Sequence, residues 1–265
     1  MPADYHTHTP LCLHATGTPE EFVDAALLAG ISEYGISDHA PVGRDFFDDW
    51  RMLYETLPQY DDWIARARAH AAGRLTIRSG FECDWLPGCE SWIEHLRGLQ
   101  PWDYLIGSVH YLGTWDFDNP KWLGRWAESD VDEVWHLYWK EYAAMAESQL
   151  FDILGHPDLV KKFCHRPSGD LRRFYEPAIE AIAVSGCAIE LNTAGWHKPC
   201  AEAYPSADFL DLARAAGIPL VISSDAHAPR EIGRDFDKAI ALAKAAGYTE
   251  TTLFDQGRRR AEPLA

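Results

Sequence analysis

Short apolar runs alternate with helix-like segments along most of this 265-residue chain, and nearly every apolar run ends in a histidine or a carboxylate. Residues 75–81 lead into Glu82, for example, and residues 104–109 lead into His110. Strands that alternate with helices are typical of a parallel sheet, and the carboxyl ends of its strands meet on one rim when the sheet closes into a barrel. An open doubly wound sheet would spread the same residues apart. The pattern therefore favours an α/β fold with a distorted (β/α) barrel, and the open sheet is the alternative.

Helix start and stop signals set the boundaries of the expected elements. Thr18, Pro19 and Glu21 form a capping box with proline at the first helical position, and Gly30 is suited to end that helix. We expect strands at residues 4–8, 33–37, 75–81, 104–109, 151–155, 187–191, 218–224 and 251–254. We expect helices at residues 20–29, 61–72, 91–99, 130–148, 171–185, 207–216 and 229–246.

Three other segments complete this interpretation. Residues 40–57 form a long loop after a predicted strand, a position that often carries substrate specificity. Residues 258–260, all arginine, are expected to lie in a solvated tail. We find no domain linker, so residues 1–265 are expected to form a single domain.

Composition limits the classes of partner. The formal net charge of -17 argues against binding nucleic acid or an anionic membrane through a basic surface. It does not exclude an anionic substrate, because bound divalent cations can reverse the local sign of charge. The sequence has neither a signal peptide pattern nor an apolar run long enough to span a bilayer, and its six cysteines are scattered. We therefore expect a cytoplasmic protein with reduced thiols, and nothing in the sequence specifies an oligomeric state.

The polar residues at the strand ends are of the types that bind metal ions. A single histidine at a strand end is more often a hydrogen-bonded core or loop residue than a ligand, but nine candidates at one end of successive strands are hard to explain in that way. Imidazole and carboxylate ligands suit Zn, Fe or Mn, and nine ligands suit two or three ions that share a bridging carboxylate. The candidates are His6, His8, His14, His39, Glu82, His110, His156, Asp225 and His227.

These residues lie in motifs that resemble those of the PHP (polymerase and histidinol phosphatase) family. The motifs are His6-Thr-His8, Ser37-Asp38-His39, Gly80-Phe81-Glu82, Gly107-Ser108-Val109-His110-Tyr111, Gly155-His156-Pro157-Asp158 and Ser224-Asp225-Ala226-His227. Further segments resemble the histidinol-phosphatase branch of the family, namely Lys161-Lys162-Phe163, Asn192-Thr193-Ala194-Gly195, Lys198-Pro199, Tyr204-Pro205-Ser206 and Gly233-Arg234-Asp235-Phe236. The resemblance extends from residue 4 to about residue 240.

The resemblance implies a distorted (β/α)7 TIM-like barrel that binds three divalent transition-metal ions (Zn, Fe or Mn). It assigns His6, His8, Glu82 and Asp225 to one ion, Glu82, His110 and His156 to a second, and His14, His39 and His227 to a third. Asp38 would orient a ligand imidazole close to the reaction. The implied reaction is the hydrolysis of L-histidinol phosphate, a small-molecule phosphate monoester, through a metal-bridging hydroxide in histidine biosynthesis.

Cationic side chains at the rim of the barrel would bind the phosphate, because phosphoryl transfer depends mainly on positioning and electrostatics. The candidates are Lys161, Lys162, His197, Lys198 and Arg230. The family usually has arginine at the position of His197, and histidine lacks the bidentate fork that suits phosphate. Either another cation compensates, or the substrate is a different phosphate ester, such as a nucleotide or a sugar phosphate. His197 could also act as the general acid for the leaving alkoxide.

Two further classes remain as alternatives. A metal-dependent amidohydrolase on a similar barrel usually carries a bridging modified lysine, and no lysine ends a predicted strand here. A non-catalytic metal-binding module, as in some polymerase-linked PHP domains, normally lacks ligands that this sequence retains.

Overall fold

The structure is a computed structural model that describes residues 2–43 and 47–264. Residues 44–46, part of the loop predicted at 40–57, lie outside the described residues. Among the described residues no helix is both long enough and apolar enough to cross a bilayer.

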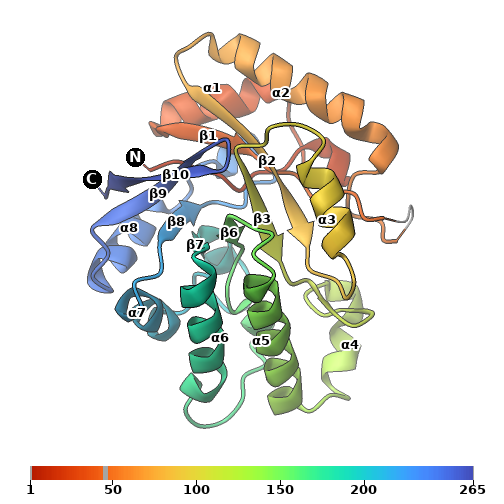
Figure 1. The fold of residues 1–265 in the computed structure, drawn as a ribbon, viewed down its shortest axis with the longest axis vertical. Coiled ribbons are helices and arrows are strands. Elements are labelled where there is room, and N and C mark those ends of the chain that lie inside the picture. Colours follow the sequence, from red (N-terminus) through yellow and green to blue (C-terminus); the bar gives the residue numbers. More distant parts are fainter. Residues whose placement is uncertain (1, 44–46, 265) are drawn as a thin grey trace.

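A curled parallel sheet forms the centre of a single α/β domain (Figure 1). Its order is β1-β2-β3-β6-β7-β8. The strands are β1 (Glu33–Ile36), β2 (Thr76–Asp84), β3 (Tyr104–Ser108), β6 (Ile153–Leu154), β7 (Ala188–Asn192) and β8 (Leu220–Ser223). All except the start of β2 are buried along their length, which explains why these runs are apolar rather than alternating.

The N-terminal segment closes this sheet. Asp4 forms a parallel bridge to Tyr34 in β1, and Thr7 forms a parallel bridge to Ala226, just after β8. The backbone N–H of Gly35 donates to the Asp4 carbonyl at 2.8 Å, and that of His8 donates to the Ala226 carbonyl at 2.9 Å. Seven parallel segments therefore form a distorted ring, which confirms the barrel and excludes the open sheet.

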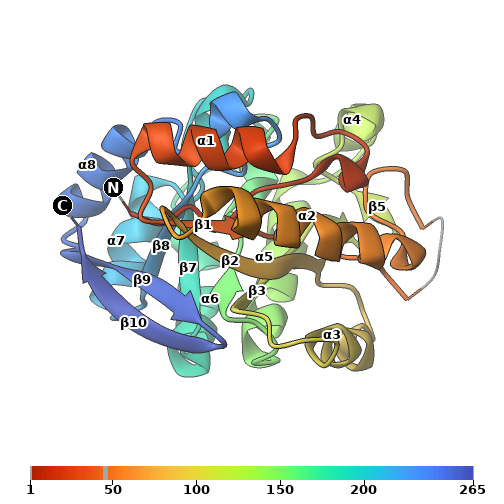
Figure 2. The same ribbon diagram turned by 90° about the horizontal axis from the view of Figure 1, so that it is seen from above.

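Helices cover the outside of this ring (Figures 1 and 2). They are α1 (Pro19–Ala29), α2 (Leu57–Ala71), α3 (Glu90–Arg97), α4 (Leu123–Trp126), α5 (Val131–Glu147), α6 (Arg172–Ser185), α7 (Ala207–Ala215) and α8 (Phe236–Ala245). The capping box of α1 is confirmed, since the Thr18 hydroxyl accepts from the Glu21 N–H and the Glu21 carboxylate accepts from the Thr18 N–H. Gly30 ends α1 in the left-handed conformation with φ 68°.

Two predicted segments differ in the structure. The helix predicted at 229–246 begins only at Phe236, because Gly233 (φ 64°) and Asp235 (φ 60°) have left-handed backbone that a helix cannot include. The tail predicted to be solvated is exposed at residues 258–260, but it forms strand β10 (Arg258–Pro263). This strand pairs antiparallel with β9 (Glu250–Asp255), which contains the strand predicted at 251–254.

The β9–β10 hairpin packs at the amino-terminal end of the barrel strands, close to both chain ends (Figure 2). Here Tyr5, Tyr104 and Phe254 form a buried apolar cluster with their neighbours, and the Tyr104 hydroxyl donates to the Tyr5 carbonyl at 2.6 Å. This apolar cluster fills the barrel at the amino-terminal end of its strands. The opposite rim is left to polar side chains.

Candidate metal centre

The structure brings the nine predicted ligands together at the carboxyl ends of the strands. The imidazole rings of His8 and His227 lie 4.0 Å apart between centroids, and those of His8 and His39 lie 4.2 Å apart. On the other side of this group the rings of His110 and His156 lie 5.0 Å apart. We call this group the histidine–carboxylate cluster; its members are His6, His8, His14, His39, Glu82, His110, His156, Asp225 and His227.

Glu82 lies at the centre of the cluster and is only 1% exposed. Its Oε2 atom lies 2.7 Å from Nδ1 of His39 and 3.2 Å from Nε2 of His6. Its Oε1 atom lies 2.9 Å from Nε2 of His156 and 3.5 Å from Nε2 of His110. Burial alone would raise the pKa of Glu82, but the surrounding imidazoles hold this pKa well below its usual value. Glu82 is therefore an ionised carboxylate in contact with both halves of the cluster, which suits a bridging ligand.

Asp225 supplies the second carboxylate from the turn that follows β8. Its backbone has φ 54°, and this conformation directs Oδ1 to within 3.1 Å of Nε2 of His8 and 3.7 Å of Nε2 of His6. Burial would raise the pKa of Asp225, but the nearby histidines, His6 first, lower it well below its usual value. The side chain thus accepts from, or shares a cation with, the pair of histidines at the N-terminus.

Three carboxylates outside the predicted ligand set orient the imidazoles. The Nδ1–H of His6 donates to Glu190 at 2.8 Å, that of His110 donates to Asp84 at 2.8 Å, and Nδ1 of His8 lies 3.4 Å from Asp38. A proton on Nδ1 leaves the Nε2 lone pair free toward Glu82 and Asp225, which is the tautomer that a metal ligand requires.

Asp38 was predicted from the sequence to orient an imidazole, whereas Glu190 and Asp84 were not predicted. Glu190 is a charged residue inside the apolar run of β7, and Asp84 follows Glu82 by two residues on the same face of β2. Both positions carried a signal, because a charge buried within a strand of a barrel requires a partner.

The donor set fits divalent cations. Several buried atoms of the cluster make no contact with hydrogen-bond geometry among the described residues, including Nε2 of His6, Nδ1 of His39, Nδ1 of His156 and Oε2 of Glu82, although some of them lie close together. Burial also lowers the pKa of His39 and of His227 well below the usual value, so these imidazoles are neutral donors. Among the described residues, four groups of histidines and carboxylates have ligand atoms within 4.8 Å of one another: His6, His8 and Asp225; His6, Glu82 and His156; His14, His39 and His227; and His8, His39 and Glu82.

Cys12, which is fully buried, also lies within this distance of His8 and His227. Burial raises the pKa of its thiol, so it remains protonated and is a poor ligand in this environment.

A cavity of about 700 Å³ opens over the cluster. Lys162, His197 and Lys198 line it, as predicted for groups that meet the substrate. Nζ of Lys162 lies 2.8 Å from Asp118, and Nε2 of His197 lies 2.6 Å from Asp235. Lys162 and His197 therefore each have a carboxylate partner that an anionic ligand would have to displace or share.

The other two predicted cations lie elsewhere. Lys161 is fully buried in the protein wall, where its Nζ lies 2.9 Å from Asp158 and donates to the Ala203 carbonyl at 2.7 Å. Arg230 points outward with its side chain 79% exposed. Arg234 does line the cavity, and its Nε atom is buried without a partner among the described residues. Arg234 belongs to the motif Gly233-Arg234-Asp235-Phe236, but it was not among the cations predicted to bind the phosphate.

A barrel that carries histidines and carboxylates on its carboxyl-terminal rim defines a metal-dependent hydrolase by its fold and its site. The sequence matches the model of the PHP domain over residues 4–194, so the chain belongs to the PHP-domain family.

The relatives give the family branch. The chain is 45% identical over 250 residues to the probable histidinol-phosphatase of Deinococcus radiodurans, covering 94% of this chain and 95% of that protein. It is 28% identical to the histidinol-phosphatase of Bacillus subtilis, covering 88% of this chain and 96% of that protein. Its fold also matches the crystal structure of the histidinol phosphate phosphatase of Lactococcus lactis complexed with zinc, L-histidinol and phosphate. The TM-score is 0.77 at 22% identity, covering 97% of this chain and 98% of that one.

Proposed function

We propose that this chain is a phosphoric monoester hydrolase that converts L-histidinol phosphate to L-histidinol and phosphate. The observation that carries the proposal is the 45% identity, over nearly the full length of both chains, to a protein named probable histidinol-phosphatase. The histidine–carboxylate cluster supports it independently, because imidazoles and carboxylates gathered at one site are suited to the metal ions that such a reaction uses.

We assign three divalent ions to the cluster, with Glu82 as the bridging carboxylate. Support for one position comes from the proximity of His6, His8 and Asp225, for a second from Glu82 and His156 with His110 beside them, and for a third from His14, His39 and His227. Zinc is the first candidate, because the Lactococcus lactis phosphatase was crystallised with zinc. Iron and manganese accept the same donor set.

The residues of the chain have separate tasks in this proposal. Bound divalent ions would supply Lewis-acid stabilisation of the phosphoryl oxygens and acidify a water molecule. Asp84 and Glu190 hold the protons on Nδ1 of His110 and His6, and Asp38 has the same task at His8. Lys162, Lys198 and Arg234 line the cavity and provide positive charge for the substrate phosphate.

His197 is proposed as the general acid for the leaving alkoxide. It lines the cavity, where its Nε2 lies 2.6 Å from Asp235, and an imidazole in such a position can carry a proton to a leaving group. This role predicts that His197→Ala slows the turnover of histidinol phosphate far more than that of an activated aryl phosphate, whose leaving group needs no proton. An equal reduction for both substrates would exclude the role.

A second candidate is hydrolysis of another small phosphate ester, because His197 occupies the position where the family usually has arginine. The test is phosphate release from L-histidinol phosphate by protein loaded with Zn, Mn or Fe, beside a chelated control and a panel of nucleotide and sugar phosphates. Strong metal-dependent preference for histidinol phosphate is the expected result. Activity confined to another phosphate would transfer the proposal to that ester.

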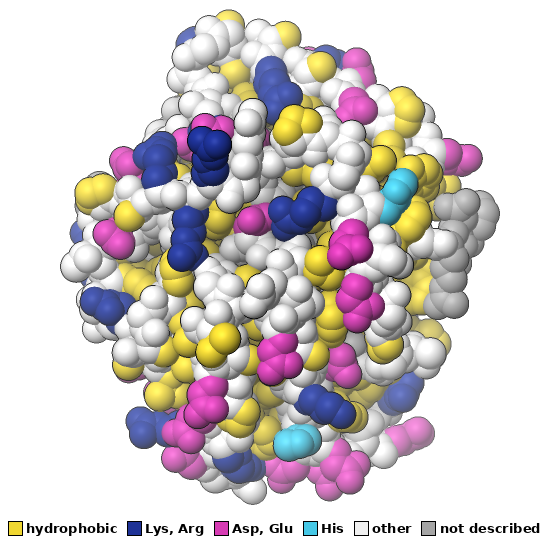
Figure 3. Space-filling model, in the orientation of Figure 1, with side chains coloured by type: hydrophobic (Ala, Val, Ile, Leu, Met, Phe, Trp, Pro, Cys, Tyr) yellow, Lys and Arg dark blue, Asp and Glu magenta, His cyan; other side chains and the backbone are white. Residues whose placement is uncertain are grey.

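A cytoplasmic location and the absence of nucleic-acid binding remain predictions from the sequence. On the face seen in Figure 3, Lys and Arg side chains lie among Asp and Glu side chains.

A further inference from the structure

Arg51 is a buried cation beside the candidate metal centre, and it is only 4% exposed. Its Nε–H donates to Asp48 at 2.7 Å, and its Nη1 donates to Asp84 at 2.5 Å and to the Ala40 carbonyl at 3.3 Å. A buried guanidinium is tolerated when its charge is paired and its N–H groups are satisfied. Arg51 is therefore fixed by two positions of its own loop, Ala40 and Asp48, and by β2, the strand that carries Glu82.

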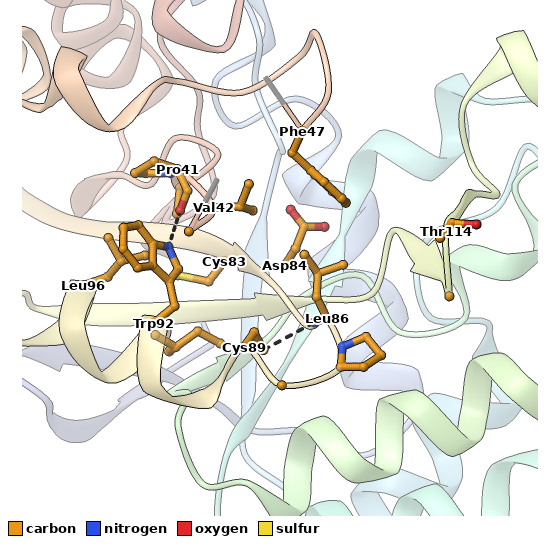
Figure 4. A pocket seen from close by; sticks show the side chains of 16 residues that line it. Pro41, Val42, Phe47, Cys83, Asp84, Leu86, Cys89, Trp92, Leu96 and Thr114 are labelled. Carbon is orange, nitrogen blue, oxygen red and sulfur yellow. Dashed lines mark hydrogen bonds between the residues drawn. The ribbon is translucent and has the colours of Figure 1, made fainter. Parts of the chain in front are cut away.

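Asp84 connects Arg51 to a ligand imidazole. It is the last residue of β2 and is 5% exposed. One carboxylate oxygen accepts from Nδ1–H of His110 at 2.8 Å, and the other accepts from Arg51. Figure 4 shows the carboxylate pointing from β2 toward the segment that carries Val42 and Phe47. Because both oxygens have donors, the carboxylate cannot rotate without breaking one of these two bonds.

The other two carboxylates that lie outside the cluster and contact Nδ1 atoms of its histidines, Glu190 and Asp38, are held differently. Glu190 accepts from the backbone N–H of His156 at 2.7 Å and from the side-chain amide of Asn192 at 3.1 Å. Asp38 accepts from the Thr9 hydroxyl and from the backbone N–H of His39. Their donors are neutral groups of the barrel, whereas the donor to Asp84 is a charged side chain from the loop between β1 and α2.

The same guanidinium also supports the wall of the cavity. Its central carbon lies 4.3 Å from the ring centroid of Trp50, which lines the cavity. The Trp50 ring lies 4.7 Å from that of His39 and 5.4 Å from that of His110, and its indole N–H donates to Asp116 at 3.2 Å. A displacement of Arg51 would therefore disturb both the orientation of His110 and the surface that faces the substrate.

We propose that Arg51 is a positioning residue that fixes Asp84 against His110 and couples the cavity wall to the metal centre. The inference rests on the proposed metal centre. It differs from a purely structural role for Arg51, which would affect folding stability but neither metal affinity nor the chemical step.

The test is the variant Arg51→Met, with zinc affinity measured by chelator competition in the absence of substrate and the visible spectrum recorded with cobalt. We expect zinc affinity at the weakest site to fall about 10- to 100-fold, as for other residues that orient metal ligands. We also expect a changed cobalt spectrum and a loss in kcat that exceeds any change in KM. Arg51→Lys should recover part of the affinity, because its ammonium can still contact Asp84.

The matched control is Arg78→Met. Arg78 forms comparable ion pairs, with its Nε 2.9 Å from Glu33. It lies on β2, the strand that ends in Asp84, but at the opposite end of the barrel. It should lose stability and keep wild-type zinc affinity. If Arg51→Met fails to fold, Asp84→Asn and Arg51→Lys carry the same measurements.

A folded Arg51→Met, or Asp84→Asn in its place, with wild-type zinc affinity and cobalt spectrum would overturn the inference. So would an equal loss of zinc affinity in Arg78→Met. A wild-type protein that bound neither metal would instead contradict the proposed metal centre itself.

Discussion

The two ends of the barrel both contain clusters of buried charge, but only one of them has the composition of a reaction site. At the amino-terminal end Glu33 accepts from Tyr5, Arg78 and Arg260, at distances of 2.6 to 2.9 Å. Arg78 also contacts Asp103 and Asp255. We call Glu33, Arg78, Asp103, Asp255 and Arg260 the lower network. Its carboxylates accept from arginine, hydroxyl or backbone donors, so each of them has partners within the protein.

The histidine–carboxylate cluster at the other end is composed differently. Imidazoles and two carboxylates converge on one another, burial lowers the pKa of His39 and of His227, and several buried atoms have no hydrogen-bond partner among the described residues. Such an arrangement is costly unless cations occupy it. Strand β2 extends from one end to the other, with Arg78 in the lower network and Glu82 in the cluster. Burial of charge alone therefore does not mark a functional site; an excess of unpaired acceptors does.

The sharpest test of this difference is Glu82→Gln. The amide keeps the shape of the side chain but removes the negative charge that would bridge two ions. We expect kcat/KM for histidinol phosphate to fall about 1000-fold or more, since metal stabilisation of the transition state is worth several kcal/mol. The thermal stability of the chelated protein should not fall, which circular dichroism can check. A variant with more than a tenth of wild-type activity would contradict the bridging role.

Arg78→Met tests the lower network. Glu33 and Asp103 are buried, at 4% and 5% exposure, and removal of the guanidinium leaves both carboxylates with fewer donors. We expect a loss of about 2 to 3 kcal/mol in the free energy of unfolding, measured by urea denaturation. Activity per folded molecule should stay at the wild-type level. A large loss of activity without a loss of stability would mean that the two ends of the barrel are coupled.

The ionisation of Asp116, which lies in the cavity wall, should make the stability of the protein depend on pH. Burial and the neighbouring Asp118 carboxylate raise the pKa of Asp116 to about 7. Because this pKa lies above the unfolded value of 3.8, the stabilising contribution is complete below about pH 4 and is lost as pH rises through about 7. Asp116→Asn should remove this dependence and stabilise the protein at pH 8 by roughly 1 to 2 kcal/mol, after allowance for solvent screening. Unchanged urea midpoints between pH 5 and pH 8 in the wild type would contradict this.

The adjacent lysines provide the smallest contrast. Lys162 lines the cavity, so Lys162→Met should raise KM about 10-fold through a lost charge–phosphate contact, with little change in stability. Lys161 lies in the wall, so Lys161→Met should lower the stability and leave KM of the folded fraction unchanged. Steady-state kinetics beside urea denaturation separates the two effects, and a reversed result would exchange the two assignments.

The contrast between these lysines shows where sequence reasoning stops. Both residues follow the same strand and have the same chemistry, and only the tertiary packing of Asp158 and the Ala203 carbonyl around Nζ decides that Lys161 is buried. Arg51 was missed for a similar reason, since its contact with Asp84 joins residues that are 33 positions apart in the sequence. The pairing of β10 with β9 likewise depends on the Gln256–Gly257 turn, whose two residues have positive φ.

The barrel and the nine clustered residues were predictable for a different reason. Buried parallel strands require continuous apolar runs, and a polar residue at the end of each run falls on one rim whatever the loops do. Capping residues fixed the start of α1, as Thr18 and Glu21 illustrate. No comparable capping signal showed that the last helix begins only at Phe236, after the left-handed residues Gly233 and Asp235.

Metal stoichiometry tests the central claim most directly. Wild type, Glu82→Gln and Arg78→Met would be dialysed against zinc, freed of excess metal and analysed by mass spectrometry. The account predicts several zinc ions per chain in the wild type, fewer in Glu82→Gln, and the wild-type number in Arg78→Met. A wild-type chain that retains no zinc, manganese or iron, or a Glu82→Gln variant that retains the full number, would contradict it.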